Sequence, residues 1–480
     1  MTLRAILDTA VAAPSRAALI FNDRAFSYGD FAAAIGAAQG AIVGYSVTAP
    51  GVVILAMGNL LDAWIFGLAS RGLGLTTLIV RSIDEFDAIA LADVRCVFAT
   101  AVGPWTGLEG ACAGKGWRLV VFGGDGVAPA PAPPTFAANP GGHILRTSGT
   151  TGAYKMVLLD PAREAVEARR RMALFELTAD SRVALADFGG WTGIGYKSAS
   201  ATWLAGGAVV INQERELRLA LTCESLTHAH LIPQMLSEIL AAPDGVAARS
   251  EALRVIVTGG PITQALADEV KARIAPRLFN SVAATEATIF AYTALESPED
   301  RRWHRPAPGV ALGVVDERDR PAPSSQIGRL RIATAGGPAG YLGDAGASAE
   351  FFKPGWFYPG DLAVMRPDGR FALHGRLTEV INVGGHKIGP APLEDALREA
   401  LGVTAVCLIS MQDEAAEEQL HLAIEASTPL DMTLVAKVLR KQMAGFEAVH
   451  VHHLHDFPRN ELGKVQRAAV HAMVTGSAEG

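Results

Sequence analysis

The sequence predicts an α/β protein with a large N-terminal domain and a smaller α+β C-terminal domain. Strand-like hydrophobic runs alternate with helix-like segments through the first half of the chain, as they do around largely parallel sheets. Half of the 480 residues are hydrophobic, which is ample for large cores. After about Ile327 the pattern changes to that of a small β unit. The N-terminal domain is therefore expected to contain stacked α/β subdomains followed by this β unit.

The strands of the N-terminal domain are predicted from short apolar runs. The apolar run 52–69 contains Asn59 and Asp62, and a membrane helix rarely holds two such residues centrally. The run is therefore expected to form a buried strand followed by a helix that begins near Asn59. The Pro- and Ala-rich stretch 127–135 predicts an extended surface segment, with a subdomain break near 127–140. The expected strands are 51–56, 77–80, 118–122, 208–211 and 255–257.

The C-terminal domain is expected to span 375–480, after an N-terminal domain that spans 1–374. The break falls at Gly375-Arg376, directly after the last strand of the β unit. Strands 328–333 and 371–374 are expected in the β unit before the break. The expected strands of the C-terminal domain are 380–383, 405–409, 419–424 and 450–454, and its expected helices are 392–401 and 432–443.

Composition narrows the classes of function. The formal net charge is −7 and there is no basic block, which argues against a nucleic-acid partner and against binding to an anionic membrane. The four cysteines are scattered without a C-x-x-C pair, so reduced thiols in a cytoplasmic protein are expected. Neither a signal peptide nor a membrane span is expected.

The segment 146–155 predicts a phosphate-binding loop. Its ten residues include four Ser or Thr, two glycines and a lysine. Glycines let the backbone approach an anion closely, while hydroxyls and a lysine supply donors and charge. The spacing is not that of a Walker loop, and a polar surface loop is the alternative.

Further motifs follow this loop in a fixed order. A glycine turn that follows a sheet strand, as 258–262 does, is where α/β folds bind flat ligands. The motifs are Thr-Gly-Gly-Pro-Ile at 258–262, Asn-Ser-Val-Ala-Ala-Thr-Glu at 280–286, Gly-Trp-Phe-Tyr-Pro-Gly-Asp at 355–361, Gly-Arg-Leu-Thr-Glu-Val-Ile-Asn-Val-Gly-Gly-His-Lys-Ile-Gly at 375–389 and Pro-Arg-Asn-Glu-Leu-Gly-Lys-Val-Gln-Arg at 458–467.

Together these motifs resemble the adenylate-forming superfamily of acyl-CoA synthetases, peptide-synthetase adenylation domains and luciferases, from about residue 15 to about 470. The resemblance implies a mobile C-terminal domain and two half-reactions. A carboxylic acid attacks the α-phosphate of ATP, with Mg²⁺, to give an acyl adenylate and pyrophosphate. A thiol, that of CoA or of a carrier protein, then displaces AMP.

The resemblance also implies roles for individual residues. Glu286 would hold Mg²⁺, a cation that prefers oxygen ligands, with Thr285 near the α-phosphate. Asp361 would accept hydrogen bonds from the ribose, beside the fixed charge of Arg376. Lys464 would bridge the attacking carboxylate and the α-phosphate, where charge develops in the transition state. The remaining ATP- and AMP-binding residues would be Thr147, Ser148, Gly149, Thr150, Thr151, Gly152, Lys155, Gly259, Gly260 and Pro261. Taken singly, each charged residue could be ordinary surface charge.

Two segments look like those of acetyl-CoA-synthetase-type enzymes, namely 186–196 and 382–389. Gly384 and Gly385 would pack on the pantetheine arm of CoA, although a tight turn without a ligand is the alternative. Thr378 occupies the family's hinge position, where Asp or Lys is usual, and could equally be a linker threonine.

The predicted acid pocket is lined by Trp191, Thr192, Tyr196, Val282 and Ala283. Val282-Ala283 replaces an aromatic residue and a glycine, and the phosphate loop ends Tyr-Lys-Met at 154–156 where Pro-Lys-Gly is usual. Small residues at 282–284 predict an acid larger than acetate. Core packing is the alternative for Trp191 and Tyr196.

Three functions remain open from the sequence. The first is an acid–CoA ligase. The second loads an acyl or amino acid onto a carrier protein, in which case Asp187 could bind an α-amino group. The third is a degenerate relative that binds a nucleotide or acyl ligand without turnover.

Overall fold

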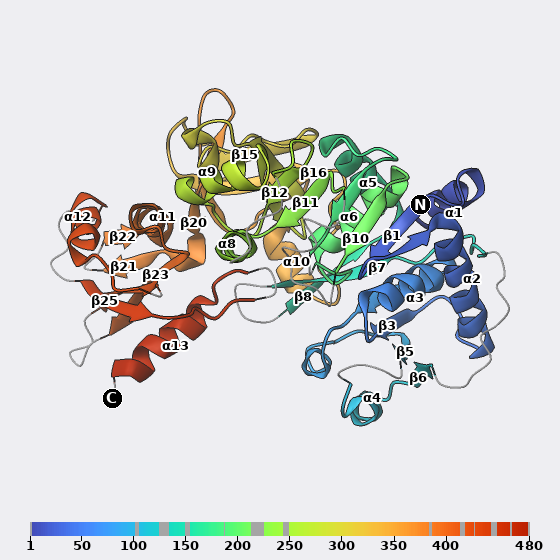
Figure 1. Cartoon of the computed structure of the whole chain (residues 1–480). Coiled ribbons are helices and arrows are strands. Elements are labelled where there is room, and N and C mark those ends of the chain that lie inside the picture. The colour runs from blue at the N-terminus through green and yellow to red at the C-terminus, as the bar shows by residue number, and fades with distance from the viewer. Residues whose placement is uncertain are drawn as a thin grey trace.

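The chain folds into a large N-terminal α/β domain and a smaller C-terminal domain that lies beside it (Figure 1). The fold is seen in a computed structural model. It describes residues 2–100, 105–123, 134–148, 154–186, 188–212, 225–242, 249–383, 386–412, 418–426, 428–442, 449–460 and 463–478.

The first sheet of the N-terminal domain has the strand order β6-β5-β3-β4-β7-β8. Its strands are parallel except for the hairpin β7–β8, which lies beyond the predicted break near 127–140, so this sheet continues past that segment. The strands are β3 (Val52–Ala56), β4 (Thr76–Ile79), β5 (Val94–Thr100), β6 (Leu119–Phe122), β7 (His143–Ser148) and β8 (Tyr154–Leu159).

The second sheet has the order β14-β13-β12-β11-β9-β10-β1-β2. Its central strands are parallel, and antiparallel pairs close both edges. The N-terminal strands β1 and β2 therefore join a sheet built mainly from residues after 180. The strands are β1 (Ala17–Phe21), β2 (Arg24–Ser27), β9 (Arg182–Ala184), β10 (Ala208–Ile211), β11 (His228–Leu231), β12 (Arg254–Val257), β13 (Arg277–Ala284) and β14 (Thr288–Ala294).

An antiparallel β unit completes the N-terminal domain, and a second α+β unit forms the C-terminal domain. The β unit contains β15 (Val310–Val315), β16 (Gly328–Thr334), β17 (Phe352–Lys353), β18 (Trp356–Phe357), β19 (Asp361–Met365) and β20 (Phe371–Arg376). The C-terminal domain contains β21 (Ile381–Val383), β22 (His386–Ile388), β23 (Ala405–Gln412), β24 (Glu418–Glu425) and β25 (Val449–Leu454).

Helices cover the sheets, and their starts follow local capping rules. Asn59, at the predicted helix start, caps α3 by accepting a hydrogen bond from the Asp62 backbone N–H at 2.8 Å. The helices are α1 (Thr2–Ala12), α2 (Tyr28–Gly44), α3 (Leu60–Gly72), α4 (Leu108–Lys115), α5 (Pro161–Leu174), α6 (Gly193–Leu204), α8 (Pro233–Ala241), α9 (Gln264–Arg273), α10 (Ala345–Phe351), α11 (Pro390–Leu401), α12 (Met432–Gln442) and α13 (Arg467–Ala478). The described residues also form the short 3₁₀ turns η1 (Ile83–Glu85), η2 (Pro298–Arg301) and η3 (Leu377–Glu379).

The largest hydrophobic core joins the two parallel sheets through the helices between them. Trp203 of α6 lies edge-on to Trp64 of α3 and tilted against Phe31 of α2, with ring centroids 4.9 and 5.3 Å apart. This packing fixes α6 and the strands beside it. In the part of the chain that the structure describes, no helix has the length and hydropathy of a membrane span.

Candidate active site

The turn between β13 and β14 carries Thr285 and Glu286. It lies against the first turn of α6, where a Cβ added to Gly193 would come 3.6 Å from the Thr285 Oγ1. The Lys197 ammonium donates a hydrogen bond to the Thr285 carbonyl oxygen at 3.0 Å. Burial lowers the pKa of Lys197 to about 8, an effect that Glu167 partly opposes. Gly193 and Lys197, both of α6, therefore contact this turn and define its position.

Glu286 is linked to the base of the predicted phosphate loop through Tyr341. The Tyr341 hydroxyl donates to Glu286 Oε1 at 2.9 Å, and burial, followed by the Glu286 charge, raises the pKa of this tyrosine. The Lys155 ammonium lies 5.0 Å from the Tyr341 ring centroid and 4.1 Å from that of Phe351. Tyr341 thus contacts Lys155 through its ring and Glu286 through its hydroxyl.

The described part of the phosphate loop is its two flanking strands. Thr147 is buried on β7 and lies directly opposite Lys155 on β8. Ser148 is described by its backbone, which pairs with Tyr154. The predicted phosphate ligands at 149–152 lie outside the described residues.

Asp361 and Arg376 form an ion pair across β19 and β20. The Arg376 Nε lies 2.9 Å from Asp361 Oδ1, and its Nη1 donates to the Pro359 carbonyl oxygen at 2.6 Å. Burial raises the pKa of Asp361, while Arg376 and then Lys464 oppose that rise. The pair leaves a second carboxylate oxygen that could accept from a ribose hydroxyl.

Lys464 reaches this site from the C-terminal domain. Its backbone N–H is held by the Asn460 Oδ1 at 3.0 Å, and a Cβ added to Gly463 would lie only 2.4 Å from the Ile232 Cδ1 of the N-terminal domain. The residue is exposed, but neighbouring atoms partly exclude water from its ammonium group, and this desolvation lowers the pKa of the ammonium. Arg376 adds to this lowering, and Asp361 and Glu286 oppose it. The structure therefore brings Glu286, Asp361, Arg376 and Lys464 into one electrostatic neighbourhood.

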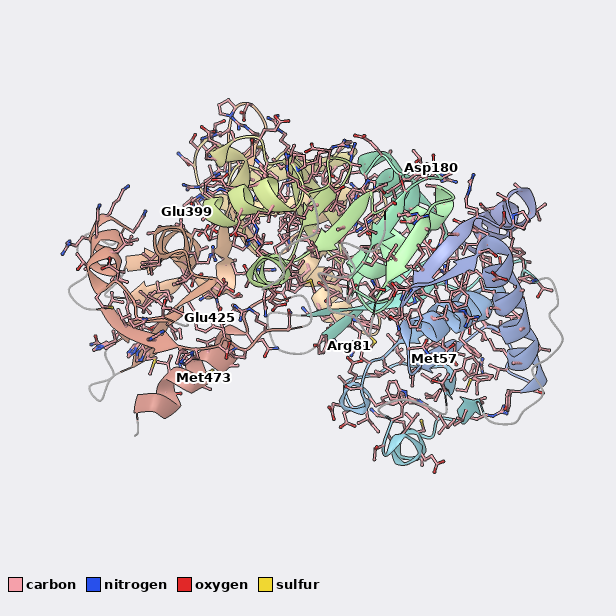
Figure 2. All side chains as sticks on the ribbon, viewed as in Figure 1. Met57, Arg81, Asp180, Glu399, Glu425 and Met473 are labelled. Atoms are coloured by element: carbon pink, nitrogen blue, oxygen red, sulfur yellow. The ribbon has the colours of Figure 1, made fainter. Side chains whose placement is uncertain are left out.

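The glycine turn 259–261 follows β12 at the carboxyl end of the parallel strands, as expected for an α/β ligand site. Gly259 has φ +85°, a conformation that favours glycine. The next residues contact the C-terminal domain, because the Gln264 backbone N–H donates to both Glu399 carboxylate oxygens at 3.2 and 3.1 Å. Arg301 Nη1 binds the same carboxylate at 2.8 Å. Figure 2 shows Glu399 at the junction of the domains.

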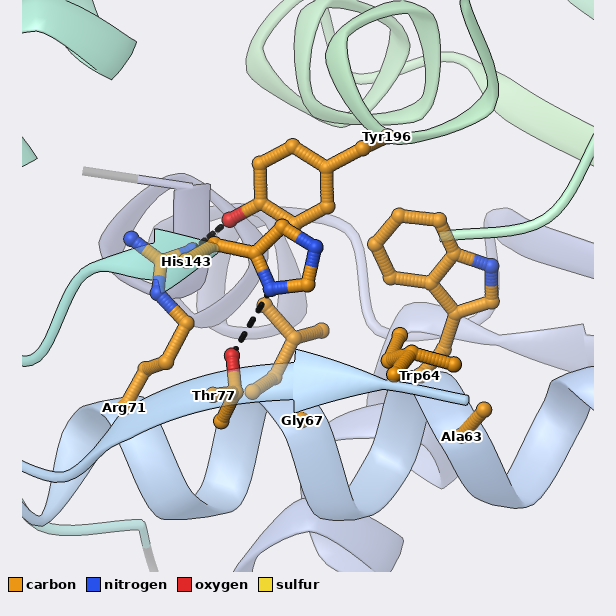
Figure 3. A pocket seen from close by; sticks show the side chains of 9 residues that line it. Ala63, Trp64, Gly67, Arg71, Thr77, His143 and Tyr196 are labelled. Atoms are coloured by element: carbon orange, nitrogen blue, oxygen red, sulfur yellow. Dashed lines mark hydrogen bonds between the residues drawn. The ribbon is translucent and has the colours of Figure 1, made fainter. Parts of the chain in front are cut away.

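Of the predicted acid-pocket residues, Tyr196 is the most deeply buried, with 2% of its surface exposed. Its ring stacks on His143 with centroids 3.9 Å apart, and its hydroxyl accepts a hydrogen bond from Arg71 (Figure 3). Burial lowers the pKa of His143 to about 3. The cavity beside this cluster encloses about 10 Å³, no more than a water needs. The structure thus places Tyr196 in core packing, and its role in binding an acid stays a prediction.

The other predicted pocket residues lie nearer the Thr285 turn. Thr192 caps α6, since its hydroxyl accepts from the Gly195 N–H at 2.9 Å. Trp191 is half-buried, with the Arg81 guanidinium 5.7 Å from its ring centroid. Val282 and Ala283 flank an irregularity in the β13–β14 pairing, which displaces the strand end that carries them.

The remaining predictions concern the C-terminal linker and nearby loops. Thr378 is exposed within η3, one residue after Leu377, whose N–H binds the Gly360 carbonyl oxygen at 2.8 Å. Gly384, Gly385 and Asp187 lie outside the described residues. Their predicted roles stay predictions.

Tyr341 and Lys197 were not predicted as site residues. Tyr341 belongs to no motif, so nothing in the sequence marks its contact with Glu286. Lys197 offers a weak signal, because it is the one charged residue of α6 (GIGYKSASATWL), and a lone charge in such a helix indicates a buried partner.

Comparisons with known proteins identify what this chain resembles in sequence and fold. Residues 114–342 match the family described as AMP-binding enzyme. Indoleacetate–CoA ligase from Aromatoleum aromaticum is 28% identical over 82% of this chain and 78% of its own length. A fatty acid–[acyl-carrier-protein] ligase from Streptomyces coeruleorubidus is 29% identical over 67% of this chain and 65% of its own length.

A solved structure has the same fold over the full length. The anthranilate CoA ligase in complex with anthranoyl-AMP superimposes with a TM-score of 0.87, at 17% identity, covering 100% of this chain and 98% of that one. Residues 114–342 are therefore similar to AMP-binding enzymes, and the whole chain shares the fold of the anthranilate CoA ligase structure. The expected resemblance to that superfamily is confirmed.

Proposed function

We propose that this protein activates a carboxylic acid with ATP as an acyl adenylate and then transfers the acyl group to the thiol of CoA. The observation that supports the proposal is that the Lys464 ammonium of the C-terminal domain lies within electrostatic range of Asp361 and Glu286 in the N-terminal domain and of Arg376 at the domain boundary. Four charged residues from distant segments would thus be available to a nucleotide and a carboxylate bound between them.

In the first half-reaction, a carboxylate oxygen attacks the α-phosphorus of ATP. The bond from that phosphorus to the bridging oxygen breaks, and pyrophosphate leaves. Lys464 would stabilise the charge that builds up on the oxygens around phosphorus, and Asp361 would orient the nucleotide by accepting from its ribose hydroxyls. A positioned cation of this kind lowers the barrier because it is already oriented before charge develops.

The donor set fits Mg²⁺ at Glu286. Mg²⁺ binds through one or two carboxylates together with phosphate oxygens and water, and one Glu286 oxygen is already oriented by Tyr341. A bound Mg²⁺ would neutralise phosphate charge. Lys155 would contribute further positive charge at the base of the phosphate loop.

In the second half-reaction, the thiolate sulfur attacks the carbonyl carbon of the adenylate. The carbon–oxygen bond to phosphate breaks, AMP leaves with the electron pair, and the thiol proton passes to solvent. Gly384 and Gly385 are proposed to leave room for the pantetheine arm, and Thr378 to lie at the hinge on which the domain 375–480 turns.

A pyrophosphate-exchange screen tests the proposal and identifies the acid. The panel would contain acetate, medium-chain fatty acids, indoleacetate, anthranilate and amino acids. We expect exchange with an acid larger than acetate, because the residues at 282–284, which belong to the predicted acid pocket, are small. Strict use of acetate would reject that pocket, and ATP binding without exchange for any acid would indicate a non-catalytic binding protein.

A carrier-protein thiol is the second candidate acceptor, supported by similarity to the fatty acid–[acyl-carrier-protein] ligase. The adenylate of the acid found in the screen would be offered free CoA or a phosphopantetheinylated carrier protein. Rapid AMP release with acyl-CoA supports CoA. Release only with the carrier protein would replace it.

A further inference from the structure

The turn that carries Thr285 and Glu286 ends in a strained residue. Thr288, the first residue of β14, has φ +59°. A β-branched residue rarely adopts this conformation, which persists only when surrounding contacts impose it. Thr288 is fully buried, so those contacts come from within the protein.

Two cations from different helices, the buried Lys197 and the partly buried Arg170, hold the turn at both ends. Lys197 of α6 donates to the Thr285 carbonyl oxygen at 3.0 Å. Arg170 of α5 donates to the Ile289 carbonyl oxygen at 2.9 Å and to the Thr288 hydroxyl. The first cation fixes the backbone directly before Glu286, and the second fixes the backbone directly after the strained residue.

A buried carboxylate of α5 holds the arginine that links α5 to α6. Glu167, 1% exposed, accepts from Arg170 Nε at 3.1 Å and from Arg171 Nε at 2.6 Å. Arg171 in turn donates to the Ser198 hydroxyl of α6 at 2.9 Å. A Cβ added to Gly336 would lie 3.2 Å from Glu167 Oε2, and one added to Gly337 would lie 2.7 Å from the Glu286 carbonyl oxygen. The turn is therefore enclosed by α5, α6 and the segment around 336–341.

We propose that Lys197 and Arg170 are positioning residues that fix the Thr285–Glu286 turn for Mg²⁺ and phosphate, which makes this inference dependent on the proposed function. Both act through the backbone, because their bonds end on carbonyl oxygens on either side of Glu286. Removing either cation releases one end of a strained turn. Glu286 then samples several positions, and its oxygen is presented correctly for a smaller share of the time.

The test uses the full-length protein with Lys197→Gln, Lys197→Arg and a matched control. Ser200→Ala is the control, because Ser200 is equally buried on α6 and its hydroxyl has no hydrogen-bond partner among the described residues. Pyrophosphate exchange would be measured against Mg²⁺ concentration with the acid from the screen. We expect Lys197→Gln to lower kcat at least tenfold and to raise the half-saturating Mg²⁺ several-fold. Lys197→Arg should recover part of both, and Ser200→Ala should match the wild type.

A second readout needs neither acid nor thiol. Calorimetric binding of ATP with and without Mg²⁺ should show a smaller Mg²⁺-dependent gain in affinity for Lys197→Gln than for the wild type. This measurement separates the two proposals, because it tests the positioning role even if no acid supports exchange.

If Lys197→Gln folds poorly, the same measurements are made on Arg170→Gln, and that variant decides the test. Arg170 is 14% exposed, so its loss should perturb folding less. Activities are compared per nucleotide-binding site, after titration with ATP. A deficit that vanishes on this basis, or an unchanged half-saturating Mg²⁺ in both variants, overturns the positioning role.

Discussion

The core of the N-terminal domain and the loop that carries Lys464 hold their charges in different ways. In the N-terminal domain, charged groups such as Arg71, Glu164, Glu167 and Arg171 are buried and paired. In the C-terminal domain, Lys464 lies on an exposed loop, and no described residue makes a hydrogen bond to its ammonium group. The proposed function would use this difference, with a buried, paired frame on one side and a charge on an exposed loop on the other.

The largest effect is expected where a buried pair of the N-terminal frame is broken. Burial alone would raise the pKa of Glu164, but the adjacent Arg71 more than offsets this, and the pKa lies below its usual range. Glu164→Gln leaves Arg71 buried without its carboxylate, which should cost about 3–5 kcal/mol of stability. Calorimetric unfolding would measure the loss, with Glu109→Gln on the exposed face of α4 as the control. An unchanged transition would mean that the frame does not depend on this pair.

The next largest effect should come from the C-terminal domain and leave stability unchanged. Lys464→Ala removes a charge that acts mainly in the transition state, so exchange should fall by about 10²–10³, or roughly 3–4 kcal/mol. ATP affinity and the unfolding transition should stay near wild-type values. Lys437→Ala, an exposed lysine on α12, is the control. A loss of ATP affinity as large as the loss of rate would argue for ordinary ground-state binding.

Sequence reasoning predicted regular elements well because their hydrophobic periods are local. The expected strand at 419–424 is β24 (Glu418–Glu425), and the expected helix at 432–443 is α12 (Met432–Gln442). The sheet assignment was harder, because β1 pairs with β10 almost two hundred residues later. Pairing over such distances leaves no local pattern in the chain.

The residues of the candidate site likewise fall into those that local motifs predict and those that only long-range packing brings to the site. Asp361 and Arg376 were predicted from motifs, and they meet as partners across one hairpin. Tyr341 and Lys197 could not be predicted, because their contacts with the Glu286 turn arise from packing between distant elements. Tyr196 shows the converse problem, since a motif position predicted a pocket residue and the structure places its ring in core packing.

A smaller effect is expected at the contact between the domains. In the structure, the Glu399 carboxylate forms an ion pair with Arg301 and accepts a hydrogen bond from the Gln264 N–H. These contacts belong to the same domain orientation that brings Lys464 within electrostatic range of Asp361. Glu399→Gln weakens charge-assisted bonds that are partly screened by solvent, so exchange should fall about fivefold, or roughly 1 kcal/mol. Thioester formation from preformed adenylate should not fall, if that step uses another orientation. Equal losses in both steps would contradict an effect specific to this orientation, and Asp395→Asn on the same helix is the control.

The smallest effect is a pH dependence that should distinguish the buried histidines from the exposed ones. Burial lowers the pKa of His304 to about 4, below the value of about 6.5 for an unfolded histidine. Below pH 6.5, His304 is protonated in the unfolded chain but stays neutral in the folded protein. The free energy of unfolding therefore decreases as the pH falls, until about pH 4. Between pH 6.5 and 5.5 this one histidine should cost about 1 kcal/mol. His304→Gln should flatten the pH dependence of unfolding by that amount, whereas His455→Gln, exposed in the C-terminal domain, should not. The same slope in both variants would mean that the burial of His304 does not persist in solution.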